Sequence, residues 1–147
     1  ANDLFDMLDG KQREKALRPE APEESDIGFR AKGDVIDGIS IESFSRDQKE
    51  HAQKVLRSLL EPYRLKDREE ALTALQKQGG LDACNLTFYK KDDLGNDGIW
   101  DNWRLEGPSF VWHYRGAPHV HVWLNVADTA KVDLNSQNRS GPLRQKS

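Results

Sequence analysis

Three of the four histidines of this 147-residue chain lie within nine positions, at His113, His119 and His121. Alternate side chains of a β-strand share a face, so His119 and His121 on one strand would project to the same side, with Cα atoms roughly 7 Å apart. Neutral imidazoles are good ligands for Cu²⁺ and Zn²⁺. The spacing therefore predicts a copper or zinc site that contains this pair.

His113 joins the pair only if an odd number of residues connects its strand to theirs. The even register would bury ring nitrogens among aromatic side chains. Each nitrogen left without a hydrogen bond would destabilise the fold by about 1–3 kcal/mol. We therefore expect the odd register, a loop over 116–118, and metal ligands His113, His119 and His121 on one face. The opposite, apolar face would then carry Phe110, Trp112, Tyr114, Val120, Val122, Leu124 and Val126.

Three nitrogen ligands leave a coordination position for water or substrate, which suits redox chemistry with copper or hydrolysis with zinc. Glu106 and Tyr114 are the candidate proton-transfer groups. If the site is catalytic, we expect a copper oxidoreductase in preference to a zinc hydrolase. Two other interpretations stay open: the histidines hydrogen-bond to neighbours such as Asn125 without metal, and Glu106 pairs with an arginine.

Other groups with potential chemistry fit structural roles better. Residues 92–97 resemble a calcium loop, but Gly95 occupies a ligand position and no glutamate closes the loop, so a hairpin turn is expected. Cys84 is the only cysteine, which excludes an internal disulfide, and we expect it to be a small buried residue. His51 lies among charged residues and is expected to be solvated.

Periodic apolar residues predict the elements that position these groups. Ser45 and Gln48 have capping-box spacing, and a helical stripe follows as far as Pro62. A second helix is expected from Asp67 to Gly79, forming a helical hairpin with the first, and a short amphipathic helix is expected before Pro19. An extended segment is expected over 35–41.

After residue 80 the apolar period changes from 3.6 to 2, which predicts strands over 86–89, 103–106, 110–114 and 119–126. The sequence therefore predicts an α+β fold, with N-terminal helices packed on a C-terminal antiparallel meander of about four strands. One domain is expected over 27–130, preceded by a helix and linker arm (1–26) and followed by a polar tail (131–147).

Charged residues make up 32% of the chain, with 22 basic and 25 acidic side chains, so no basic field indicates nucleic acid. No apolar run approaches the length that a membrane helix needs. The runs over 11–24 and 131–147 in the two terminal arms are poor in large apolar groups. We expect them to contact a protein partner or a second copy of the chain.

The segment Arg104-Leu-Glu-Gly-Pro-Ser-Phe-Val111, followed by His119, His121 and Trp123, resembles the C-terminal signature of an uncharacterised bacterial family found mostly in exported proteins. The resemblance spans residues 40–127. It implies that the histidine pair and Glu106 match the family's histidines and glutamate, whereas His113 stands where an acidic residue is common. It also implies a periplasmic or extracellular protein. Alanine as the first residue is compatible with this expectation.

The function expected from these patterns is metal binding, with or without catalysis. The alternative is a non-catalytic subunit, or a structural or interaction domain of an exported assembly. The resemblance carries no activity with it.

Overall fold

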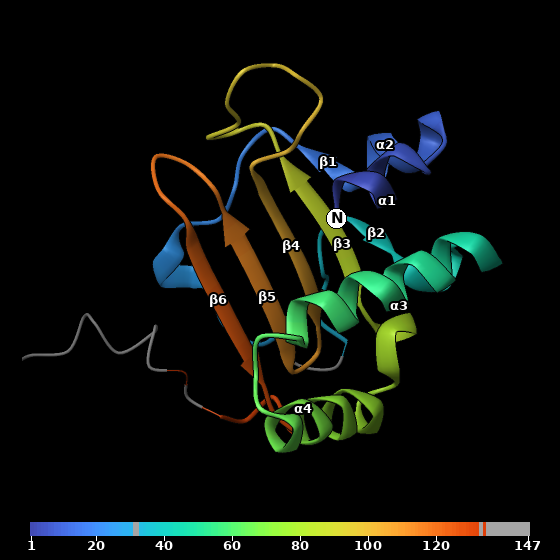
Figure 1. Ribbon diagram of the computed structural model, residues 1–147, viewed down its shortest axis with the longest axis vertical. Coiled ribbons are helices and arrows are strands. Elements are labelled where there is room, and N and C mark those ends of the chain that lie inside the picture. The colour runs from blue at the N-terminus through green and yellow to red at the C-terminus, as the bar shows by residue number, and fades with distance from the viewer. Residues whose placement is uncertain (31–32, 133, 135–147) are drawn as a thin grey trace, which may run out of the picture.

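A mixed six-stranded sheet forms the centre of the protein in a computed structural model, which describes residues 1–30, 33–132 and 134. Its strands run in the order β1-β3-β4-β5-β6, with β2 also paired to β3 (Figure 1). The antiparallel meander β3 to β6 confirms the predicted α+β class. The strand bounds are β1 (Leu17–Arg18), β2 (Ile39–Ser40), β3 (Asn85–Tyr89), β4 (Asn102–Gly107), β5 (Phe110–Arg115) and β6 (His121–Val126).

The N-terminal segment forms two helices, α1 (Asn2–Asp6) and α2 (Gly10–Ala16), where the sequence predicts one. The prediction is wrong because Asp9 starts a new helix. Its side chain accepts a hydrogen bond from the backbone N–H of Gln12, whose side chain accepts one from the backbone N–H of Asp9. The chain then becomes extended at Leu17 and pairs in parallel with β3.

The two longer helices are α3 (Arg46–Leu60) and α4 (Leu65–Lys77). The capping box of Ser45 and Gln48 at the start of α3 is confirmed. Helix α4 begins two residues before the predicted position, with Arg64 as its N-cap; Asp67 therefore lies in its first turn and pairs with the guanidinium of Arg64 at 2.8 Å. Short 3₁₀ turns cover η1 (Glu24–Asp26), η2 (Ile41–Ser43) and η3 (Gly80–Ala83). None of the described helices is long and apolar enough to cross a membrane.

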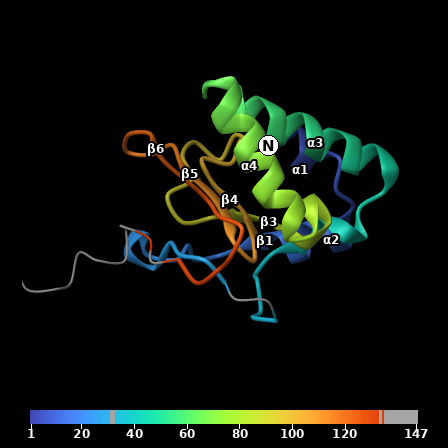
Figure 2. The same cartoon turned by 90° about the horizontal axis from the view of Figure 1, so that it is seen from below.

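One face of the sheet is apolar and lies against the helices. Figures 1 and 2 show α1, α3 and α4 on this side. The segment over 1–26, expected to be an arm, contributes to this core: Leu4 and Leu8 are buried, and the Phe5 ring meets the Phe88 ring edge-on at 4.8 Å. The strand residues buried here are Leu86, Phe88, Trp103, Leu105, Phe110 and Trp112.

The opposite face of the sheet is polar, and a long connection covers it. We call this connection the strap; its described residues are 19–30 and 33–37, and Figure 2 shows it below the sheet. Thr87 donates a hydrogen bond to the carbonyl of Asp37 at 3.0 Å, and Asn85 donates one to that of Ile36 at 2.8 Å. Next to them Gly38 has φ +92°, and a Cβ there would lie 2.2 Å from Thr87 Oγ1. The end of the strap therefore lies directly on β3.

The pairing of β5 with β6 is in the odd register, as predicted, with Trp112 opposite Leu124 and Tyr114 opposite Val122. The connection spans residues 116–120, however, and not the predicted 116–118. Ala117 is buried while the next three residues are exposed, so the chain turns at an extended tip before pairing begins. His119 consequently lies in the connection and not on β6.

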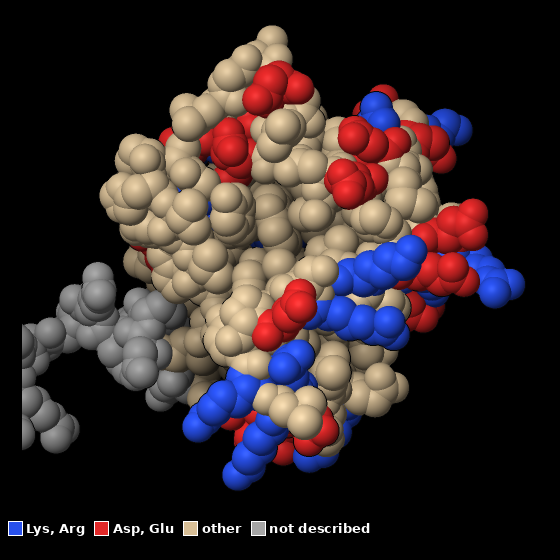
Figure 3. Space-filling view, viewed as in Figure 1, with Lys and Arg blue, Asp and Glu red and all other residues tan. Residues whose placement is uncertain are grey.

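Charged side chains of both signs lie side by side over α3 and α4, as the composition predicts (Figure 3). Two of the contacts are the i,i+4 pair Arg46–Glu50 and the pair Lys49–Asp82, each at 3.0 Å. Residues 133 and 135–147, most of the predicted polar tail, lie outside the described residues.

Candidate functional site

The structure brings His119 and His121 together at the hairpin tip, with ring centroids 4.5 Å apart. His113 shares the polar face with His121 but lies directly opposite Trp123. The Trp123 ring contacts both imidazoles, at 5.4 Å from His113 and 5.3 Å from His121. The three predicted ligands thus divide into a pair at the tip, of which His119 is exposed and His121 half-buried, and a buried His113 on the other side of the Trp123 ring.

Within residues 1–30, 33–132 and 134, no three His, Cys, Asp or Glu side chains form a group that could hold a metal ion. The pair does have a carboxylate neighbour, Glu24 of the strap, whose Oε1 lies 3.3 Å from His121 Nδ1. Glu24 also pairs with Arg115 Nη2 at 2.5 Å, and Arg115 Nη2 lies 2.7 Å from the same His121 nitrogen. No sequence pattern pointed to Glu24, because only the fold of the strap places it there.

Glu106 lies in the middle of the polar face and is bound by two arginines. Arg30 Nε donates to Glu106 Oε1 at 3.2 Å, and Arg104 Nη1 donates to Oε2 at 3.5 Å. Only 1% of the surface of Arg104 and 5% of that of Glu106 is exposed. Two such charges in a protein interior require partners, so the carboxylate of Glu106 stabilises the buried guanidinium.

His113 is held as a neutral, oriented imidazole. Arg104 Nε donates to its Nδ1 at 3.2 Å, which places the ring proton on Nε2. Burial, followed by the positive charges of Arg104 and Arg115, lowers the pKa of His113 from 6.5 to about 3. His113 is therefore uncharged at neutral pH and presents an N–H donor at Nε2.

This lowered pKa predicts a loss of stability in mild acid. Below pH 6.5 the histidine of the unfolded chain takes up a proton that the folded protein excludes, so stability falls as the pH falls toward 3. Between pH 7.5 and 5 this one group should cost about 2 kcal/mol. Urea unfolding at both pH values measures the difference. Over the same pH interval the free energy of unfolding of His113→Gln should fall by about 2 kcal/mol less than that of the wild type. His51→Gln should show the wild-type decrease. An equal decrease in all three proteins would contradict the assignment of this effect to His113.

Tyr114, a predicted proton-transfer group, points to the other side of the sheet from His113. Its ring stacks on Trp103 with centroids 5.7 Å apart, and its register partner Val122 lies on the same apolar face. The structure therefore does not bring Tyr114 to the histidines. Cys84 is fully buried, as expected, and burial raises the pKa of its thiol to about 12.

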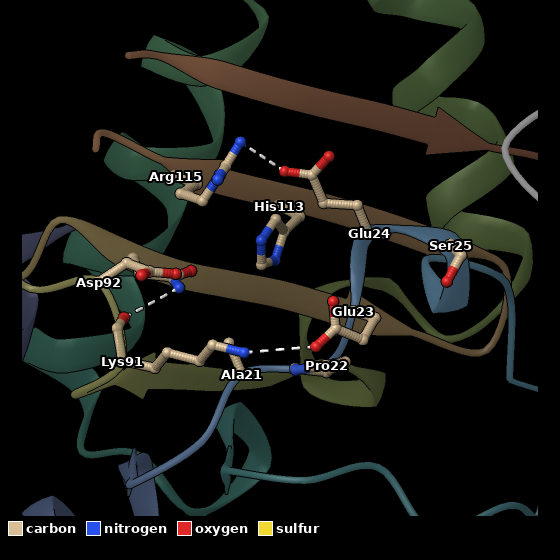
Figure 4. A pocket seen from close by; sticks show the side chains of 10 residues that line it. Ala21, Pro22, Glu23, Glu24, Ser25, Lys91, Asp92, His113 and Arg115 are labelled. Atoms are coloured by element: carbon tan, nitrogen blue, oxygen red, sulfur yellow. Dashed lines mark hydrogen bonds and ion pairs between the residues drawn. The ribbon is translucent and has the colours of Figure 1, made fainter. Parts of the chain in front are cut away.

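A cavity of about 380 Å³ opens beside His113 on the polar face. Figure 4 shows His113 at its centre, with Arg115 on one side and the 21–25 part of the strap on another. The sequence did not indicate this cavity, because its walls come from three separate parts of the chain. The remaining wall residues are Lys91, Asp92 and Asn102.

The fold and the site together define an α+β domain with a buried, charged sheet face under a strap. No family model, no curated protein and no solved structure matches this chain.

Proposed function

We propose that the tip of the β5–β6 hairpin binds a transition-metal ion through His119 and His121. The observation that supports this most is the 4.5 Å separation of the two ring centroids on an exposed tip. Two imidazoles from neighbouring positions can share one ion at metal–nitrogen distances of about 2.0–2.1 Å, with water completing the coordination. The sequence resemblance described above would assign the same two histidines.

Glu24 would orient one of these ligands without binding the metal. If His121 Nδ1 carries the proton and donates it to Glu24 Oε1, 3.3 Å away, the lone pair of Nε2 is free for the ion. The alternative contact, with Nδ1 accepting from Arg115 Nη2, puts the proton on Nε2 and blocks it. The proposal therefore requires the first tautomer, in which Arg115 pairs with Glu24.

The predicted third ligand, His113, would need the Trp123 indole to move and the Arg104 contact to break, so the proposed site consists of the tip histidines alone. Two neutral nitrogens bind Cu²⁺ more tightly than Zn²⁺, in line with the general order for divalent metals. Copper held this way could support the oxidoreductase activity predicted from the sequence. A binding role without catalysis would use the same two ligands.

Calorimetric titration of the tag-free protein with Cu²⁺ and with Zn²⁺ tests this proposal. We expect one Cu²⁺ per chain, and a loss of at least roughly tenfold in affinity in the His119→Ala/His121→Ala double variant. Glu24→Gln should weaken binding by about tenfold or more, because the carboxylate no longer orients His121.

His51→Ala is the matched control, since it removes a histidine from α3 and should leave Cu²⁺ affinity unchanged. His113→Gln decides the composition of the site. Unchanged Cu²⁺ affinity supports a site of His119 and His121 alone, and reduced Cu²⁺ affinity would show that His113 is a third ligand. Cu²⁺ affinity that is equal in the wild type and in the double variant would refute metal binding at the tip.

A further inference from the structure

Strand β6 forms one edge of the sheet, and in the described part of the chain no strand pairs with its outer side. Its residues, His121–Val126, include no Lys, Arg, Asp or Glu, and neither proline nor glycine. Edge strands usually carry a charged side chain, a proline or a bulge, which keeps them from pairing with another chain. The absence of these features from β6 indicates an edge that can accept a further strand.

The opposite edge of the sheet has the protection that β6 lacks. It consists of β1 and β2, each of which is two residues long (Figure 1). Strand β1 ends at Arg18, and Pro19 follows directly. Such short strands, next to a charge and a proline, offer few backbone groups to another chain. The two edges of the sheet therefore differ in their capacity to pair.

The backbone groups on the outer side of β6 belong to alternate residues. The N–H of Ala127, just after the strand, donates to the carbonyl of Ser109, its register partner, at 3.0 Å. Bonded pairs alternate along an antiparallel ladder, so the odd-numbered residues of β6 bond to β5. The even-numbered residues direct their N–H and C=O groups away from β5, toward the free edge. These outward residues are Val122, Leu124 and Val126.

The side chains of the outward residues lie on the apolar face of the sheet, where the helices cover β6 incompletely. Val122 is 44% exposed, and Val120 in the adjoining connection is 62% exposed. Figure 3 shows mainly uncharged side chains over this part of the surface. At the other end of β6 a groove of about 530 Å³ lies between the strand and α4, and its lining includes Ala71, Ala74 and Val126. The strand thus has exposed apolar side chains at its start and a partly apolar groove at its end.

We propose that β6 pairs antiparallel with β6 of a second copy of the chain, so that one sheet continues through both copies. A two-fold axis beside Leu124 would place Leu124 opposite Leu124, and Val122 opposite Val126 of the second copy. The paired side chains on the apolar face are then all aliphatic, and no like charges meet. Val122 of each copy would also lie next to the groove at α4 of the other.

A second copy fits this edge because the two complementary features lie at opposite ends of the same strand. An antiparallel two-fold contact brings the start of one strand to the end of the other, so both exposed valines and both grooves are used at once. The proposal does not depend on the metal site, since it involves the outer edge of β6 and not the imidazoles of the tip.

Analytical ultracentrifugation of the full, tag-free chain in EDTA tests the proposal. EDTA prevents a metal ion from joining two hairpin tips, so the result is independent of the proposed metal site. We expect a monomer–dimer equilibrium with a dissociation constant in the micromolar range, because the contact is limited to one short strand from each copy. A protein that remains monomeric up to about 1 mM would overturn the proposal.

Val122→Pro removes one outward N–H from each copy and leaves the bonds to β5 in place, since proline is tolerated on the free side of an edge strand. It should weaken the dimer at least roughly tenfold. Val122→Ile, the matched control, keeps both the N–H and a branched apolar side chain and should form the dimer like the wild type. Circular dichroism verifies that each variant is folded.

Val122→Glu is a second test, which applies even if the proline variant does not fold. It keeps the N–H but places a carboxylate next to the groove of the other copy, where Asp67, Glu70 and Asp128 outnumber Lys77. It should also weaken the dimer at least roughly tenfold. Equal dimerisation by the wild type and either folded variant would contradict pairing through β6.

Amide hydrogen exchange, followed by NMR at low and high protein concentration, identifies the strand that pairs. The amides of Val122, Leu124 and Val126 should exchange more slowly at high concentration, because only the dimer gives them acceptors. The amide of Trp123, which bonds to β5 within one copy, should be protected at both concentrations. A dimer that leaves the exchange of the three outward amides unchanged would show that the copies associate elsewhere.

Discussion

Replacing Arg104 with methionine is expected to lower the free energy of unfolding by about 3–5 kcal/mol, the usual cost of removing one partner from a buried ion pair. The substitution leaves the carboxylate of Glu106 buried with Arg30 as its remaining cation. It also removes the donor to Nδ1 of His113. Urea unfolding followed by tryptophan fluorescence at pH 7.5 measures the change.

The double variant Arg104→Met/Glu106→Leu separates the charge from the packing. It replaces both partners with apolar side chains of similar length, which is often neutral or stabilising in a protein interior. We therefore expect it to be more stable than Arg104→Met alone. A double variant that is less stable than Arg104→Met would show that the buried carboxylate of Glu106 costs little free energy once Arg104 is absent. Arg46→Met, at a side chain that is 89% exposed, should change stability by less than about 0.5 kcal/mol.

Truncation of Phe88 to alanine should cost about 3–5 kcal/mol, because it removes a fully buried ring from the middle of the apolar face. The ring on the other side of the contact, Phe5, belongs to α1 and would lose its edge-to-face partner. The expected loss is the same whether it is measured by urea or by heat, after conversion to one temperature.

Leu65→Ala is the control for this truncation, since Leu65 is 64% exposed at the start of α4 and its truncation should cost less than about 1 kcal/mol.

Deletion of residues 1–8 provides a second measurement. If the N-terminal segment is part of the core, the deletion should destabilise the protein by several kcal/mol, because Leu4, Phe5 and Leu8 are all buried. A deletion that leaves stability unchanged would show that this segment is an independent arm.

The sequence by itself determined the features that depend on local rules. The capping box of Ser45 and Gln48 requires only two side chains and the first turn of a helix, so its spacing predicts the start of α3 correctly. The alternation of aromatic and polar residues in β5 predicts the register of the hairpin, because a shift of one residue would exchange the two faces of the strand.

The pairing of Glu106 with an arginine was one alternative that the sequence offered, but the tertiary structure decided the other polar contacts of this face. Arg104 Nε reaches His113 Nδ1 because their strands pair directly across β4 and β5. Glu24 reaches Arg115 and His121 because the strap folds across the polar face. The contacts of Glu24 could not be predicted from the sequence, because about 90 residues separate it from Arg115 and no local pattern relates the two.

The length of the hairpin tip was decided in the same way. The odd register permits either three or five connecting residues, and the burial of Ala117 within a five-residue connection is a tertiary contact. The histidine motif was thus visible in the sequence. Its division into a pair at the hairpin tip and a buried, neutral His113 required the folded sheet, because burial and neighbouring charges set the protonation state of an imidazole.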